Sequence, residues 1–171
     1  YAPLAVDEQR AVREKLTGGA PYLICVGSMH ARKNVARLLL AFDRIAAEQP
    51  TLRLVFVGEQ MFHDARMEEA WAQVKHKDRV VFTGRLGQQE LRRTLGAAMA
   101  LVYVSYFEGF GIPVAEAMKC GVPVVCANAT RAPHLDTSMP NGATNMPMMP
   151  SIIRRVRCGM RLNMPSMSSI L

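Results

Sequence analysis

The sequence predicts an α/β protein in which helices cover both faces of one parallel β-sheet. Short apolar runs, most of which end in glycine, alternate five times along the chain with segments whose apolar residues recur at helical spacing. None of these runs approaches the roughly 20 apolar residues that a membrane span requires. With 50% hydrophobic and 20% charged residues among 171, the composition is that of an ordinary soluble globular domain.

The first expected elements are a short helix and a buried strand. Asp7 is expected to cap the helix, and the pair Gly18–Gly19 to end it. A strand over residues 21–27 follows, because this apolar run lies between a proline and a glycine and has no polar face. After a polar turn, apolar residues at helical spacing predict a helix from Val35 to Ala46, which Pro50 ends.

The remaining elements repeat this alternation. Strands are expected over residues 52–58, 80–84, 100–105 and 122–128. Helices are expected over residues 67–74, 91–98 and 113–119. Such an alternation indicates right-handed β-α-β units and therefore one parallel sheet, whose ligands bind beyond the carboxyl ends of the strands. Those ends are expected at Gly27-Ser28, Gly58-Glu59, Gly84-Arg85, Ser105 and Asn128.

The charge and the cysteines limit the function classes. A net charge of +7, from 21 basic and 14 acidic residues, suits phosphate, nucleic acid or an anionic membrane surface equally. Nucleic acid is the weakest of these, because the basic residues are scattered and lack interleaved aromatic residues. The four cysteines form no Cys-x-x-Cys pair, and Cys25, Cys120 and Cys126 lie in apolar runs. We therefore expect reduced, buried thiols and no zinc site.

The loop after the first strand carries a candidate phosphate site. Arg32 and Lys33 stand where the next helix is expected to begin, although the helix dipole disfavours cations at that end. A bound anion would remove this conflict, and a helix N-terminus binds anions itself. The alternative is that both residues are solvated surface cations.

The loop after the fourth strand carries two carboxylates and a glycine-rich helix start. Gly109 and Gly111 allow a ligand to approach the backbone closely, and Pro113 suits the first position of a helix. Glu108 lies in the loop, and Glu116 is expected in the first turn of that helix. Carboxylates accept hydrogen bonds from vicinal hydroxyls and free amides bind phosphate, so the combination suits a sugar nucleotide. The alternative is that Glu116 only complements the dipole and Glu108 is an ordinary loop residue.

The stretch that contains both carboxylates resembles the signature of the family 4 retaining glycosyltransferases, which have the GT-B fold. It is Tyr-Phe-Glu-Gly-Phe-Gly-Ile-Pro-Val-Ala-Glu-Ala-Met-Lys-Cys-Gly-Val-Pro-Val-Val, with the Glu-x7-Glu spacing of that family. Three other segments resemble the family in the right order: Pro-Tyr-Leu-Ile-Cys-Val-Gly with Arg-Lys-Asn after it, Leu-Val-Phe-Val-Gly, and Val-Val-Phe-Thr-Gly-Arg-Leu. The resemblance covers about residues 20–130 and is of the type of bacterial mannosyl- and rhamnosyltransferases of cell-surface polysaccharides.

This resemblance implies a role for each residue of a donor site. Lys33 would contact the donor diphosphate with Arg32 beside it, and Ser28 stands where many members carry a further arginine. Glu108 would bind hexose hydroxyls and Glu116 the ribose hydroxyls, with Glu108 and Lys33 as the catalytic residues. The donor would also meet the backbone of Gly109, Phe110, Gly111 and Ile112, and its base would lie near Gly84, Arg85 and Leu86.

The resemblance also implies an enzyme, a hexosyltransferase that uses a nucleotide-diphosphate sugar and needs neither a cofactor nor a metal. Retaining transfer would need no dedicated base, since the departing phosphate can take the acceptor proton. The alternatives from other classes are a nucleotide-sugar-binding module without transfer activity and a GT-B epimerase or phosphorylase relative.

The expected partners follow from the same family. A saccharide or lipid-linked acceptor would bind an N-terminal domain that is missing from this chain, so we expect the chain alone to have little or no activity. No nucleic-acid partner is expected. The expected location is the cytoplasm, with peripheral association of the full-length protein at the inner face of the plasma membrane as a further expectation.

Composition divides the chain into three parts. Residues 1–19 are expected to be an inter-domain linker with a short helix, and residues 20–135 a Rossmann-like donor-binding domain, one half of a GT-B fold. Residues 136–171 hold seven of the twelve Met and four of the ten Pro, with one acid and no periodic pattern, so we expect an irregular tail. Its origin is expected to be a frame shift that begins between residues 128 and 136, and the alternative is an evolved basic tail.

Overall fold

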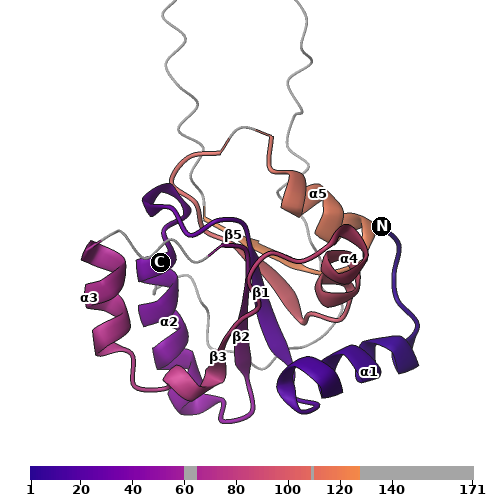
Figure 1. The fold of residues 1–171 in the computed structure, drawn as a ribbon, viewed down its shortest axis with the longest axis horizontal. Helices are drawn as coiled ribbons and strands as arrows, with labels where there is room; N and C mark the ends of the chain where they lie inside the picture. Colours follow the sequence, from indigo (N-terminus) through magenta and orange to yellow (C-terminus); the bar gives the residue numbers. More distant parts are fainter. Residues whose placement is uncertain (60–64, 109, 128–171) are drawn as a thin grey trace, which may run out of the picture.

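The computed structural model describes residues 1–59, 65–108 and 110–127, which form a five-stranded parallel β-sheet between two layers of helices (Figure 1). The strands are β1 (Tyr22–Val26), β2 (Arg53–Val57), β3 (Val80–Phe82), β4 (Ala100–Tyr103) and β5 (Val124–Cys126). Their order in the sheet is β3-β2-β1-β4-β5, and each neighbouring pair is parallel. The predicted fold class is therefore confirmed.

The helices divide between the two faces of the sheet (Figure 1). One face carries α2 (Val35–Glu48) and α3 (Ala65–Gln73), and the other carries α1 (Val6–Thr17), α4 (Gln88–Gly96) and α5 (Ile112–Lys119). Two 3-10 turns, η1 (Ala31–Lys33) and η2 (Lys77–Arg79), precede α2 and β3. Arg13 Nε of α1 donates to the Ala97 carbonyl at 2.8 Å, which ties α1 to the end of α4.

Alternation along the central strands separates two hydrophobic cores. Because successive strand residues point to opposite faces, Leu23 and Cys25 of β1 join the core under α2 and α3, whereas Tyr22, Ile24 and Val26 join the core under α4 and α5. All five residues are buried, as predicted from the continuous apolar run. Fully burying a side chain of this size contributes roughly 1.5–3 kcal/mol to folding stability. The two cores therefore give the loops of the site a stable, well-packed base.

β5 is the least covered strand of the described sheet. Val124 and Val125 are half-buried and Cys126 is exposed. The prediction of buried thiols is thus right for Cys25 and Cys120 and wrong for Cys126. The reason is its position at the end of an edge strand, which has a neighbouring strand on one side only among the described residues.

Three further predictions concern the ends of the chain. Asp7 is not the cap of α1, because Ala5 holds that position and Asp7 lies in the first turn, where a carboxylate still favours the helix dipole. Gly18 ends α1 in the left-handed conformation with φ 62°, as predicted. Residues 128–171 lie outside the described part, so the tail and the domain limit at residue 135 stay predictions, and so does the limit at residue 19. In the described ranges, no helix has the length and apolarity to cross a membrane.

Candidate functional site

The loops after β1 and β4 form the candidate site. From β1 the chain extends the sheet through β2 to β3, and then returns to place β4 on the opposite side of β1. This reversal between β1 and β4 is the topological switch point, at which parallel sheets of this type bind ligands. The predicted residues Arg32, Lys33 and Glu108 lie in these two loops.

Hydrogen bonds tie the two loops together. Asn34 Nδ2 donates to the Val104 carbonyl at 3.2 Å, and the Tyr106 N–H donates to the Arg32 carbonyl at 2.8 Å. Asn34 has a left-handed backbone with φ 57°, which Asn tolerates, and it separates η1 from α2. Arg32 and Lys33 therefore lie in η1 of this loop, just before α2, which begins at Val35 as predicted.

Glu108 supplies an anion to these two cations. Its Oε1 lies 2.6 Å from Lys33 Nζ and 2.6 Å from Arg32 Nη1. The Lys33 side chain is 9% exposed and the Arg32 side chain 49% exposed, so only the pair with Lys33 is shielded from water. The anion that the sequence predicted beside these cations is, in this structure, a carboxylate of the chain itself.

Lys33 reaches Glu108 through a narrow passage between Gly27 and Tyr103. A Cβ on Gly27 would lie 3.0 Å from Lys33 Cε, and Gly27 has φ 132°, a conformation that favours glycine. On the other side, Lys33 Nζ lies 5.1 Å from the centre of the Tyr103 ring, a distance typical of a cation–π contact. The missing side chain of Gly27 thus allows a buried ammonium at the end of β1.

The charge states of the cluster follow from its surroundings. Burial opposes ionisation of the Glu108 carboxyl, but the Lys33 ammonium outweighs it, with help from the nearby Tyr103 hydroxyl, and the pKa lies below its ordinary value. For Tyr103, burial and then the charge of Glu108 raise the pKa to about 12. At neutral pH, Glu108 is therefore an anion and Tyr103 a neutral hydrogen-bond donor.

The contact that Glu116 makes is not with the cluster of Arg32, Lys33 and Glu108. It is the fifth residue of α5, so the prediction that it stands in the first turn is wrong, because α5 begins at Ile112. Its carboxylate is the acceptor for the Tyr1 hydroxyl, and burial together with this hydrogen bond raises the Tyr1 pKa to about 12. The structure brings Glu108 to Arg32 and Lys33, whereas it brings Glu116 to the N-terminal residue.

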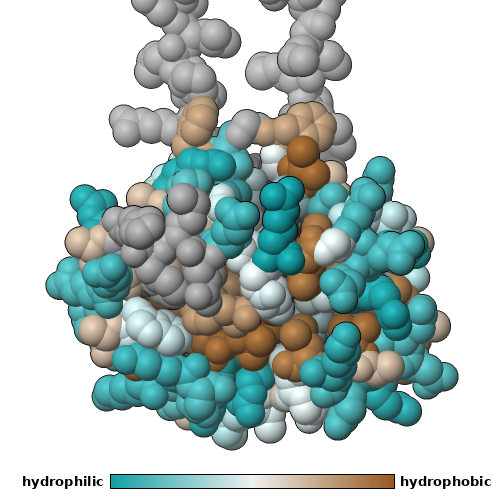
Figure 2. All heavy atoms as spheres, viewed as in Figure 1, coloured by the Kyte–Doolittle hydropathy of each residue, from teal (hydrophilic) through white to brown (hydrophobic). Residues whose placement is uncertain are grey.

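The start of α5 presents backbone and apolar side chains to solvent. Gly111 holds the N-cap position with φ 72°, and Pro113 is the second residue of α5, one position later than predicted. The side chains of Phe110 and Ile112 are exposed, at 85% and 59%, and Figure 2 shows apolar side chains over this end of α5. Gly109 lies outside the described residues. The contacts of this segment with a donor stay predictions.

Gly84 and Arg85 follow β3, which is separated from β1 by β2. The Gly84 carbonyl accepts from the Gly58 N–H at 2.9 Å, and Arg85 Nη1 lies 4.0 Å from Glu59 Oε1 in an exposed pair. Leu86 packs against the core under α4 and α5. Their role as the border of the base stays a prediction.

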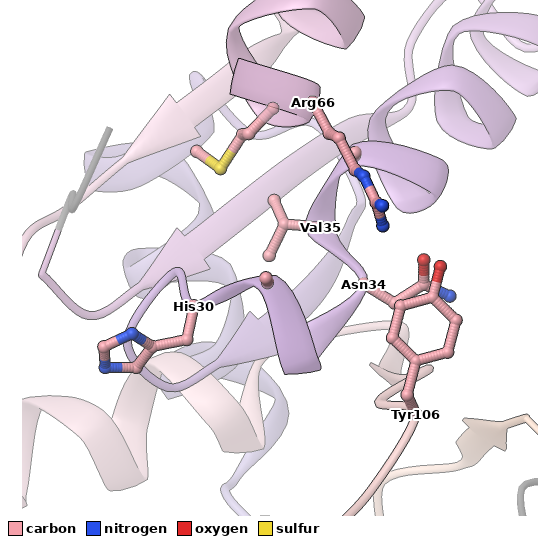
Figure 3. Close-up of a pocket in the computed structure, with 8 residues that line it drawn as sticks. His30, Asn34, Val35, Arg66 and Tyr106 are labelled. Carbon is pink, nitrogen blue, oxygen red and sulfur yellow. The ribbon is translucent and has the colours of Figure 1, made fainter. Parts of the chain in front are cut away.

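A pocket opens beside the cluster on the α2–α3 face (Figure 3). It has about 320 Å³ of empty space, part of it open solvent, and is lined by His30, Ala31, Asn34, Val35, Ala36, Arg66, Met67 and Tyr106. In Figure 3 the Arg66 side chain points from α3 toward Asn34 and Tyr106, whereas His30 points away from them. Arg37 lies over the Tyr106 ring at 5.4 Å. The pocket borders the candidate site without including Lys33 or Glu108.

The sequence predicted the two cations and Glu108 but missed Gly27 and Tyr103 as parts of the site. The available signal for Tyr103 was its polar group at the end of an otherwise apolar strand, next to the loop that carries Glu108. The arrangement as a whole suits an anionic ligand with hydroxyl groups, because two cations and a carboxylate meet at one point. Within the described ranges, no three His, Cys, Asp or Glu side chains are grouped to hold a metal ion.

Known sequences similar to this chain are sugar transferases. A sequence model of the family "Glycosyl transferases group 1" matches residues 7–142. O-antigen chain mannosyltransferase B of Escherichia coli is 35% identical over 118 residues, 67% of this chain and 30% of that protein. The GDP-mannose-dependent monoacylated alpha-(1-6)-phosphatidylinositol monomannoside mannosyltransferase of Corynebacterium glutamicum is 29% identical over 146 residues, 80% of this chain and 38% of that protein. The chain spans about a third of the length of these relatives.

Solved structures with the same fold are GT-B glycosyltransferases. The C-terminal domain of a glycosyl transferase group 1 family protein (LpcC) from Francisella tularensis matches with a TM-score of 0.63 and 23% identity, covering 78% of this chain and 71% of that chain. Anabaena Alr3699/HepE in complex with UDP and glucose matches with a TM-score of 0.61 and 23% identity, covering 74% of this chain and 35% of that chain. At this identity the likeness shows the fold alone.

Proposed function

This chain belongs to the glycosyl transferases group 1 family, and we propose that it is the donor-binding domain of a retaining mannosyltransferase that uses a nucleotide-diphosphate mannose. One observation carries the proposal: Lys33, Arg32 and Glu108 meet at the switch point between β1 and β4. The choice of mannose rests on the names of the two curated relatives, one of which is GDP-mannose-dependent.

The ionic cluster supports a diphosphate in this position. Glu108 already holds two cations at 2.6 Å, which shows that both can reach one anionic oxygen. A diphosphate carries more negative charge than a carboxylate and would compete for the same donors. Once displaced from Lys33, the Glu108 carboxylate would be free to accept hydrogen bonds from hexose hydroxyls.

The same groups would serve the transfer step. When the bond between the sugar and the diphosphate breaks, negative charge develops on the departing phosphate, and the ammonium of Lys33 would stabilise it at a shielded position. Glu108 would orient the hexose, and the departing phosphate would take the proton of the acceptor hydroxyl. The contribution of this chain is therefore binding, orientation and charge stabilisation. The acceptor, a saccharide or lipid-linked saccharide, would bind outside this chain.

Calorimetric titration of the whole chain with GDP-mannose, GDP, UDP-glucose and UDP tests the proposal. We expect GDP-mannose to bind, and Lys33→Ala to weaken GDP binding by about 1.5–3 kcal/mol, roughly 10- to 150-fold, since a charged hydrogen-bond donor is lost. The control is Lys15→Ala, an exposed lysine in the last turn of α1, which should leave binding unchanged.

Two results would contradict this proposal. If none of the four nucleotides binds the unaltered chain, the donor-binding role fails. If Lys33→Ala binds GDP as tightly as Lys15→Ala does, a nucleotide site exists but does not use the cluster at Lys33.

A further inference from the structure

Tyr103 lies next to both the cation Lys33 and the carboxylate Glu108 of the ionic cluster. It is the last residue of β4, and its side chain lies on the face that carries α4 and α5. From this position its ring meets Lys33 and its hydroxyl faces Glu108. One side chain therefore contacts the group proposed for the diphosphate and approaches the group proposed for the hexose.

The ring of Tyr103 restricts the position of Lys33. Lys33 Nζ lies 5.1 Å from the ring centre, and on the other side the Lys33 side chain packs against the backbone of Gly27, so closely that an added Cβ would lie 3.2 Å from Nζ. A lysine side chain has four rotatable bonds, so a free Lys33 would lose considerable entropy on binding a phosphate. Because ring and glycine together confine it, the ammonium is already placed for an anion.

The hydroxyl of Tyr103 lies against the Glu108 carboxylate, outside ideal hydrogen-bond geometry. It is buried, faces the Glu108 carboxylate, and lies about 4.0 Å from the place where a Cβ on Gly111 would be. Among the described residues it has no partner in hydrogen-bond geometry. A small movement of the Glu108 side chain would bring these two groups into a full hydrogen bond, which a buried hydroxyl favours.

Donor binding supplies such a rearrangement. A diphosphate that takes Lys33 and Arg32 removes both of the cations that hold Glu108 Oε1. The half-buried carboxylate then needs another donor, and the neutral Tyr103 hydroxyl is the donor that faces it. Tyr103 can therefore keep Glu108 in place while its former partners bind the donor.

We propose that Tyr103 is a positioning residue of the donor site, whose ring places Lys33 for the diphosphate and whose hydroxyl places Glu108 for the hexose. This inference rests on the proposed function. The ring and the hydroxyl of Tyr103 have different roles in this proposal. One substitution that removes the hydroxyl alone and another that removes both groups can therefore separate the two roles.

The test compares Tyr103→Phe with Tyr103→Leu, using GDP and GDP-mannose as probes, or UDP and UDP-glucose if the titration selects that pair. Tyr103→Phe keeps the ring, so GDP affinity should stay within about twofold, while the additional affinity of GDP-mannose over GDP should fall about tenfold, as expected for one hydrogen bond to a charged group. Tyr103→Leu removes both parts, so GDP affinity should fall as well.

A control separates positioning from stability. Tyr22 also has a buried hydroxyl, which donates to the Thr94 carbonyl away from the site, so Tyr22→Phe should lower the Tm and leave both affinities unchanged. Equal effects of Tyr103→Phe on GDP and GDP-mannose, or no effect on either, would overturn the inference even though the unaltered chain binds both. Failure of the unaltered chain to bind any nucleotide would instead overturn the proposed function.

Discussion

Two carboxylates of the described structure, Asp43 and Glu108, are both held by several donors but by donors of different kinds. Asp43 Oδ1 of α2 lies 2.9 Å from the N–H of Lys75, the N–H of His76 and His76 Nδ1. Glu108 is held by side chains instead, with the cations of Lys33 and Arg32 each 2.6 Å from its Oε1. In both cases the pKa lies below its ordinary value even though burial opposes ionisation.

The kind of donor decides what each carboxylate can do. The backbone N–H groups that hold Asp43 cannot leave without moving the chain between α3 and η2, so Asp43 joins α2 to that segment permanently. The cations that hold Glu108 are side chains, so another anion can replace Glu108 beside them without any movement of the backbone. A carboxylate that accepts from the backbone indicates a structural role, and one that pairs with side-chain cations indicates a site that can exchange its partner.

The largest effect is expected on stability, from Asp43→Ala. The substitution removes the acceptor of the exposed Lys75 N–H and of the partly buried His76 N–H, and should lower the free energy of unfolding by about 1–3 kcal/mol, with no change in nucleotide affinity. Urea denaturation measures the first quantity and calorimetry the second. Asp7→Ala, at an exposed aspartate of α1, is the control and should stay within about 0.5 kcal/mol. A loss of nucleotide binding in Asp43→Ala would contradict the distinction between a structural Asp43 and a ligand-binding Glu108.

A smaller effect is expected from pH, because acid removes only the charge. A carboxyl whose pKa is lowered by folding contributes its full stabilisation above the unfolded value of about 4, and loses it as the pH falls through the lowered folded value. Urea denaturation between pH 6 and pH 3 should therefore show the difference between the unaltered chain and Asp43→Asn shrinking below pH about 4. A difference in the free energy of unfolding that stays constant over this pH range would contradict the stabilising role of the Asp43 charge.

The smallest effect is expected from Arg32→Ala. The Arg32 side chain is 49% exposed, and exposed ion pairs contribute about 0–1 kcal/mol. We expect the affinity for GDP to fall by less than about fivefold, which is well below the loss expected in Lys33→Ala. The loss in Arg32→Ala should be smaller still at high salt, because salt screens exposed charges. An effect of Arg32→Ala as large as that of Lys33→Ala would show that Arg32 is the main phosphate contact, in the role that Ser28 cannot fill.

The sequence predicted best where one local rule decides the structure. The run of β1 is apolar throughout because β1 is buried on both faces, and Gly18 ends α1 because it adopts φ 62° without strain. Prediction failed where a neighbour distant in sequence decides. The anion beside Arg32 and Lys33 is Glu108 from a loop more than 70 residues further along the chain, and Glu116 contacts Tyr1.

What the sequence determined by itself is the alternation of strands and helices, and the presence of Arg32, Lys33 and Glu108 in loops that follow strands. Those features are local, because periodicity, proline and glycine act over a few residues. Only the tertiary structure decided that β4 lies beside β1, since apolar periodicity does not encode strand order. That order brings Lys33 between Gly27 and Tyr103 and against Glu108, so the contacts of the site arise from packing between distant segments.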